Sequence, residues 1–102
     1  MTENVKNIQF ALGLAQKAGK LVSGDWAVRD SLKQKKIKLI VLATDASQNS
    51  KKEVYQFARP QKIEIIEEIT ACEIGSAIGK GKRICAGILD INFVNLLKSK
   101  RL

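Results

Sequence analysis

The sequence predicts an α/β fold, a three-layer α-β-α sandwich in which helices cover both faces of a small four-stranded mixed sheet. Three observations support this prediction. The 102 residues are enough for one domain, and 45% apolar residues supply its core. Strand-like apolar runs also alternate with segments of helical periodicity. We therefore expect residues 1–102 to form a single domain.

The first half of the chain alternates helix, strand, helix and strand. Apolar residues spaced three and four apart predict a first helix that ends near Gly19, and residues 21–23 form a short strand between two glycines. Asp25 is expected to cap a second helix that runs to about Lys35. The continuous apolar run at residues 39–43 is typical of a strand covered on both faces.

The second half repeats this rhythm. A polar turn at residues 44–50 precedes a helix that ends at Arg59-Pro60, because the residue before proline avoids the helical region. Thr70 and Glu73 form a capping box at the start of the next helix. The other expectations are a strand at 63–66, a strand at 84–89, and inward positions for Val54, Phe57, Ala58, Phe93, Leu96 and Leu97.

Charge is the most informative part of the composition. Eighteen Lys and Arg against ten Asp and Glu give a net charge of +8, which indicates a polyanionic partner. Residues 17–38 and 79–102 each carry +5, whereas residues 39–78 carry −2. The two basic segments form either a one-sided basic surface or part of an evenly basic exterior. The absence of histidine excludes imidazole catalysis and imidazole metal ligands.

The cysteines and the N-terminus predict an ordinary intracellular chain. Cys72 and Cys85 stand in apolar surroundings without the spacing of a redox or zinc motif, so we expect both to be small buried hydrophobes. Residues 1–4 lack the basic start of a signal peptide, and no apolar stretch is long enough to span a membrane. A cytoplasmic location is expected.

Two glycine–lysine segments do not fit a phosphate loop. Residues 75–81 have one residue too few between the glycines and lie at a predicted helix C-terminus, whereas residues 13–20 have one too many. Asp45 and Asp90 each follow a strand, where α/β proteins often keep ligand groups, but a turn or cap role is the simpler interpretation. With no acid/base pair, we expect no enzyme.

The segment from Gly19 to Arg29 is the best functional candidate. Gly24 allows the backbone to approach a ligand closely, and the helix after it presents free N–H groups suited to phosphate. Trp26, the only tryptophan, is either an exposed ring that stacks on an unpaired base or a buried core anchor. Asp25 places a negative charge in the same turn, which weakens phosphate binding.

Several segments resemble one known family. The turn AGKLVSG, with KLIVLATDAS, IGSAIGKGKR and ICAGILD after it, is similar to the kink-turn RNA-binding family of ribosomal proteins (the L-seven-Ae family), and most of all to its bacterial YlxQ-type branch. The likeness extends over nearly the whole chain. It implies an α-β-α sandwich that binds structured RNA through the turn before the second helix and the loop before the fourth helix.

The two contact segments differ from the family pattern. Members that bind kink-turns typically follow the matching glycine with Thr-Asn-Glu or Thr-Lys-Gln, and place a lysine six positions after that glycine. Here Asp-Trp-Ala follows Gly24, Asp30 takes the place of the lysine, and residues 67–70 make the second loop acidic. We therefore expect contact with the RNA backbone more than the usual kink-turn readout.

These observations predict a non-catalytic RNA-binding protein of the ribosome or its assembly. The expected partner is structured RNA, above all ribosomal RNA, with no cofactor, metal or membrane, and a monomer is favoured. Two alternatives stay open: an adaptor that binds a ribosomal or other protein through Trp26, and an enzyme acting on RNA or nucleotides. The residues expected to contact RNA are Lys20, Ser23, Gly24, Asp25, Trp26, Arg29, Lys33, Thr70, Lys82 and Arg83.

Overall fold

Helices and strands alternate along the chain, as the sequence predicts. The computed structural model describes residues 2–100, with side chains described for residues 3–99. No helix in this part of the chain is long and apolar enough to cross a membrane. The elements are α1 (Thr2–Lys17), β1 (Leu21–Ser23), α2 (Asp25–Lys33), β2 (Leu39–Ala43), α3 (Gln48–Ala58), the 3-10 helix η1 (Arg59–Gln61), β3 (Ile65–Ile69), α4 (Ala71–Ala77), β4 (Cys85–Ile88) and α5 (Ile91–Lys100).

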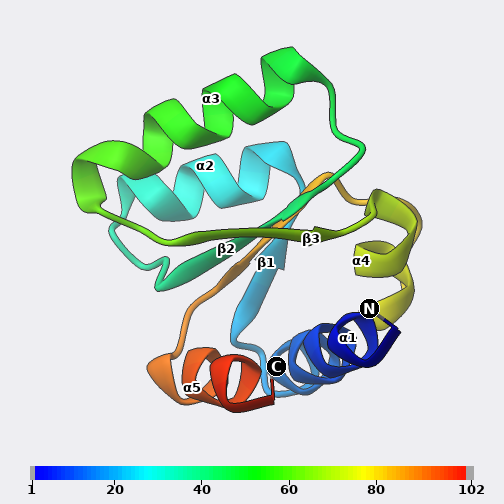
Figure 1. Cartoon of the computed structure of the whole chain (residues 1–102). Coiled ribbons are helices and arrows are strands. Elements are labelled where there is room, and N and C mark those ends of the chain that lie inside the picture. Colours follow the sequence, from blue (N-terminus) through cyan, green and yellow to red (C-terminus); the bar gives the residue numbers. More distant parts are fainter. Residues whose placement is uncertain (1, 101–102) are drawn as a thin grey trace.

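Four strands form one mixed sheet in the order β1-β4-β2-β3. Strand β4 is antiparallel to both of its neighbours, β1 and β2, whereas β3 runs parallel to β2. Helices α2 and α3 cover one face of the sheet, and α1, α4 and α5 lie on the other side (Figure 1). The predicted three-layer sandwich is confirmed.

The two central strands are buried along their whole length. Every residue of β2 and of β4 is buried, as the continuous apolar run at residues 39–43 indicates. Ile8 and Leu12 of α1 and Leu97 of α5 are also fully buried. Because each large aliphatic side chain contributes about 1.5–3 kcal/mol when it leaves water, apolar burial between the layers is the main source of stability.

The third strand begins later than predicted. It spans Ile65–Ile69 instead of 63–66, because η1 and Lys62, whose φ is 56°, first turn the chain back toward the sheet. The N–H of Ile63 still bonds a carbonyl at the end of α3, at 3.2 Å. Residue 63 therefore still bonds to the helix end, whereas the Glu64 carbonyl already accepts from the Ile40 N–H of β2, at 3.0 Å.

Other boundaries move by a few residues. Helix α3 begins at Gln48, inside the expected turn, because the Ser47 hydroxyl accepts a hydrogen bond from the Ser50 N–H at 3.1 Å and caps the helix there. Helix α2 ends at Lys33 and β4 is two residues shorter than residues 84–89. None of these shifts changes which face of an element is buried.

Two residues expected in the interior lie at the surface. Phe57 is 40% exposed, because Val54 and Ala58 occupy the inward face of α3. Cys72 is exposed on α4, where Ala71 and its neighbours on the same face take the inward positions. Only Cys85, in β4, is buried as the sequence predicts.

The strand ends define two regions at opposite ends of the sheet. We call one the Gly24 end: here β1, β2 and β3 finish and β4 begins, and its residues are 23–24, 43–47, 69–71 and 82–85. We call the other the Lys20 end, where β4 finishes; its residues are 19–20, 33–38 and 89–90.

Candidate nucleic-acid interface

The turn between β1 and α2 is built on Gly24. Its φ of 93° and ψ of 158° belong to a region that only glycine adopts readily, and its N–H donates to the Cys85 carbonyl at 2.9 Å. Gly24 is also the N-cap residue of α2, and no side chain caps the helix. The first N–H groups of α2 therefore have no side-chain acceptor at the N-cap, as a phosphate site requires.

Asp25 is not the cap that the sequence indicates. It lies in the first turn of α2, and its carboxylate accepts a hydrogen bond from the Arg29 Nε at 3.2 Å. The left-handed conformation of Gly24 gives the N-cap position to the glycine, which moves Asp25 into the helix. The aspartate therefore neutralises a neighbouring arginine instead of blocking the helix N–H groups.

Trp26 is the most exposed large apolar side chain described in the protein. It is 77% exposed, so the core-anchor interpretation is wrong. The inward positions of α2 are taken by Val28, Ser31 and Leu32. An indole held in solvent at the start of a helix offers a flat face for stacking on a base or for packing against a protein.

Arg29 is committed to contacts within the protein. Its guanidinium pairs with Asp25 and with Glu53 of α3, and it lies over the Phe57 ring at 4.7 Å from the centroid. These contacts join α2 to α3 on the outer face of the sandwich. Since two carboxylates surround this one cation, the Arg29 cluster is not a basic patch.

The loop between α4 and β4 brings Arg83 to the Gly24 turn. The Arg83 N–H donates to the Ala71 carbonyl at 3.1 Å, and its Cδ lies 4.0 Å from the point where a Cβ on Gly24 would stand. The loop takes this path because Gly75 has no side chain: a Cβ there would lie 2.0 Å from the Gly81 carbonyl oxygen. Gly24, Arg83 and the start of α4 are therefore neighbours, together with Lys82.

The start of α4 holds Thr70 in a structural role. The Thr70 hydroxyl accepts from the Glu73 N–H at 3.1 Å, and the Glu73 carboxylate accepts from the Thr70 N–H at 2.8 Å, which confirms the capping box. Asp45 accepts from the Ala71 N–H at 2.9 Å and so ties the loop after β2 to the same helix. Asp90 likewise accepts from the Asn92 N–H at 2.8 Å. Both aspartates are therefore turn and cap residues.

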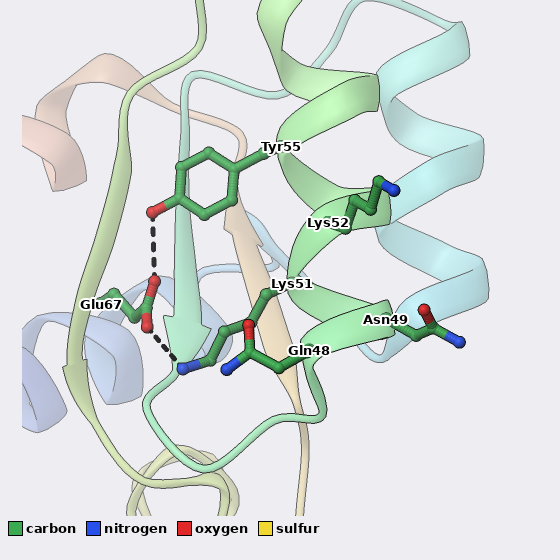
Figure 2. Close-up of a pocket in the computed structure, with 6 residues that line it drawn as sticks. All are labelled: Gln48, Asn49, Lys51, Lys52, Tyr55 and Glu67. Carbon is green, nitrogen blue, oxygen red and sulfur yellow. Dashed lines mark hydrogen bonds and ion pairs between the residues drawn. The ribbon is translucent and has the colours of Figure 1, made fainter.

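The acidic character of the second contact segment is partly neutralised. Glu67 accepts from the Lys51 ammonium at 2.8 Å and from the Tyr55 hydroxyl at 3.1 Å, across an open hollow between β3 and α3 (Figure 2). The hydrogen bond from Lys51 lowers the pKa of Glu67 below 4.5, and the Tyr55 hydrogen bond acts in the same direction. Sequence reasoning missed Lys51 and Tyr55, although their i, i+4 spacing places both on one face of a helix.

Lys20 and Lys33 lie away from this group. The Lys20 carbonyl accepts from the Leu89 N–H at 2.9 Å, which places it at the Lys20 end, and Lys33 closes α2 on the same side. The structure therefore brings together Ser23, Gly24, Thr70, Lys82 and Arg83, with Trp26 beside them, and separates two of the predicted lysines. Within residues 2–100, no three potential ligand side chains are grouped for a metal ion.

Sequence and fold both match proteins of one family. Residues 6–97 match the model of the ribosomal protein L7Ae/L30e/S12e/Gadd45 family. The chain is 33% identical over 87 residues to "RNA-binding protein YlxQ" of Enterococcus faecium, covering 85% of this chain and 84% of that protein. It is 34% identical over 88 residues to the Bacillus subtilis (strain 168) protein of the same name, covering 86% and 88%.

A solved structure shows the same architecture. The "Giardia lamblia 15.5kD RNA binding protein" aligns with a TM-score of 0.82 over 96% of this chain and 84% of that one, at 13% identity, so the two share a fold. The family expected from the AGKLVSG turn and the segments after it is confirmed. This chain belongs to the ribosomal protein L7Ae/L30e/S12e/Gadd45 family, with YlxQ-type proteins among its relatives.

Proposed function

We propose that this chain is a non-catalytic RNA-binding protein that serves the ribosome, in its assembly or in translation. Its YlxQ relatives are named as RNA-binding proteins, and its net charge of +8 suits a polyanionic partner. The observation that carries the proposal is the Gly24 turn. There an uncapped helix N-terminus, an exposed tryptophan and the Arg83 side chain occur within one small surface.

Each of these groups suits a different part of RNA. The N–H groups at the start of α2 and the cations of Lys82 and Arg83 bind phosphate oxygens, which positions the protein without reading sequence. Trp26 stacks on an unpaired base, a contact that contributes about 1–3 kcal/mol. Because the residues after Gly24 supply no amide side chain for base edges, recognition depends on the shape and the backbone of a folded RNA.

A binding role agrees with the chemistry of the side chains. The chain has no histidine, and the two aspartates that follow strands hold backbone N–H groups at 2.8–2.9 Å. Imidazole chemistry is therefore absent, and these two carboxylates serve turns and helix starts, which favours binding over catalysis.

Salt dependence tests the proposal directly. Fluorescently labelled fragments of ribosomal RNA are titrated with the protein at several salt concentrations. Six phosphate contacts predict a loss of about three orders of magnitude in affinity between low and moderate salt. A flat plot of log K against log salt refutes the proposal. Cosedimentation of the protein with ribosomal particles from the producing cells checks the ribosomal part.

The tryptophan contact has its own test with a matched control. Trp26→Ala removes an exposed ring and is expected to weaken RNA binding by about 5- to 100-fold, as the loss of one stacked base predicts. Phe10→Ala removes another ring, 52% exposed, from α1, and is expected to leave affinity unchanged. Equal affinities of the two variants refute the stacking role.

A protein partner is the second candidate function. Trp26 is 77% exposed, and Arg29, three residues later on the same helix, is already paired with Asp25 and Glu53, so this cation is less available to an RNA phosphate. An aromatic anchor of this kind is typical of a protein–protein hot spot. Reversing the charge of Lys82 and Arg83 separates the two: an RNA site loses its ligand, whereas an adaptor anchored by Trp26 keeps its partner.

A further inference from the structure

Four lysines line a hollow at the Lys20 end, the opposite end of the sheet from the Gly24 turn. The hollow has a volume of about 380 Å³. Of the residues that the sequence predicts to contact RNA, only Lys20 lines it, and none of the groups assigned to the Gly24 turn under the proposed function does. Its lining residues are Gly19, Lys20, Lys35, Lys36, Lys38 and Leu89.

The sheet topology gathers these lysines. Strands β1 and β2 both run antiparallel to β4, so the residues that precede them meet on either side of the end of β4. The Lys20 carbonyl accepts from the Leu89 N–H at 2.9 Å, and the Lys38 N–H donates to the Ile88 carbonyl at 2.8 Å. The sheet therefore fixes the backbone of the hollow at Lys20, Lys38 and Leu89.

Lys35 occupies a position where glycine is the usual residue. Helix α2 ends in a Schellman motif: the Lys35 N–H donates to the Leu32 carbonyl and the Lys36 N–H to the Ser31 carbonyl. Lys35 is the residue of that motif in the left-handed region, with φ 58°. A lysine there is less stable than glycine by about 1 kcal/mol, so the chain keeps a positive charge at a cost to its folding.

The charge of the hollow exceeds what local partners neutralise. The ion pairs identified within residues 2–100 include none of the four lysines. Helices α1 and α2 both end here, and each helix C-terminus is equivalent to about half a negative charge. Asp90, the nearest acidic residue along the chain, follows Leu89 and bonds the Asn92 N–H. Four ammonium groups therefore outweigh roughly one negative charge from the two helix ends together with the one charge of Asp90.

We propose that this hollow binds phosphates of the RNA backbone, as a second contact separate from the Gly24 end. The inference rests on the proposed RNA-binding function. Ammonium groups bind phosphate as point charges, and the lining offers no aromatic, amide or hydroxyl side chain that reads a base. The molecule measures 30 × 27 × 25 Å, so an RNA that reaches both ends follows its surface or presents two segments. The protein thereby prefers folded RNA to a short single strand.

The strained lysine provides a test that separates binding from stability. Lys35→Gly removes one charge and relieves the left-handed strain; the same substitution at Lys62, the other lysine with positive φ, does both outside the hollow. With labelled ribosomal RNA fragments as probe, Lys35→Gly is expected to lower the salt slope of binding by about one, while Tm stays equal or rises. Lys62→Gly is expected to leave the slope unchanged. Equal slopes for the two variants overturn the inference.

A pair of double variants tests the whole surface. Lys20→Gln/Lys36→Gln is expected to lower the salt slope by about two, whereas Lys6→Gln/Lys52→Gln, on helices α1 and α3, leaves it unchanged. Oligouridylate, a flexible single strand, is expected to discriminate less between the two doubles than the folded fragments do. Equal effects of the two doubles on the folded fragments overturn the inference.

The Gly24 end is tested in parallel. Suppose that Lys82→Gln/Arg83→Gln lowers the salt slope of binding, while Lys20→Gln/Lys36→Gln gives the same slope as Lys6→Gln/Lys52→Gln. The second contact is then refuted and the proposed function stands. If only the Lys20 double lowers it, the hollow is supported and the Gly24 end is refuted as the RNA surface. If both double variants lower the salt slope, and the quadruple variant lowers it by the sum of the two effects, both contacts are supported.

Discussion

Replacing Gly24 by alanine tests the backbone conformation on which the candidate interface depends. At φ 93° and ψ 158°, an alanine costs about 1–3 kcal/mol of strain. Space is not the obstacle, since the nearest heavy atom to the new Cβ is the Arg83 Cδ at 4.0 Å. Alanine also restricts the unfolded chain, which returns about 0.4–1 kcal/mol. We therefore expect Gly24→Ala to lower the free energy of unfolding by about 1–2 kcal/mol.

Urea unfolding with an internal control measures this effect. Gly19→Ala is the matched variant, because Gly19 has φ 70° and no heavy atom within 4 Å of its Cβ position. The milder left-handed conformation there predicts a loss of about 1 kcal/mol or less. The m-value should stay constant in both variants, which shows that only stability changes. A Gly24→Ala protein as stable as the original refutes the conformational role assigned to this glycine.

Three further predictions concern other parts of the fold. Hydrogen bonds from α3 lower the pKa of Glu67. This contact therefore stabilises the protein above pH 4.5, and the contribution is lost as pH falls through the folded-state pKa. The Tm of a Glu67→Gln variant should decrease less between pH 7 and acid than the Tm of the original chain. Burial raises the pKa of the Cys85 thiol to about 12, whereas Cys72 is exposed. A disulfide reagent at pH 8 should therefore label Cys72 quickly and Cys85 only after unfolding. Rapid labelling of both cysteines contradicts the buried position of Cys85. Gly75→Ala places a Cβ 2.0 Å from the Gly81 carbonyl oxygen and should destabilise the domain by roughly 1–3 kcal/mol in urea unfolding; unchanged stability means that the loop is free to move away.

Local patterns were sufficient to predict most of the fold. The apolar run at residues 39–43 is a buried strand, and the capping box of Thr70 and Glu73 forms as expected, because both depend on neighbouring residues alone. Phe57 was predicted inside because its spacing fits the helix face. It lies outside because Val54 and Ala58 take the inward face of α3, and the Arg29 guanidinium, from a different helix, lies over its ring. That contact between α2 and α3 depends on tertiary structure, which periodicity does not report.

The candidate site was predictable at its centre and not in its extent. Gly24 and the helix after it follow from the sequence, since both belong to one turn. Lys20 lies only four residues earlier, but a strand rises about 3.3 Å per residue, so β1 separates the two by about 13 Å and places them at opposite ends of the sheet. In contrast, Arg83 is distant in sequence and reaches Gly24 through the pairing of β1 with β4. Charge counts along the chain do not contain this information.

The acidic residues of β3 also bear on solubility. This strand has a neighbour on one side only, since β3 is last in the sheet order, and an open strand is a template for pairing with another molecule. Glu67 and Glu68 put carboxylates on that strand, and charged side chains there oppose edge-to-edge association of two copies. An engineered protein with neutral residues at these positions would therefore gain attraction for RNA and lose a safeguard against aggregation.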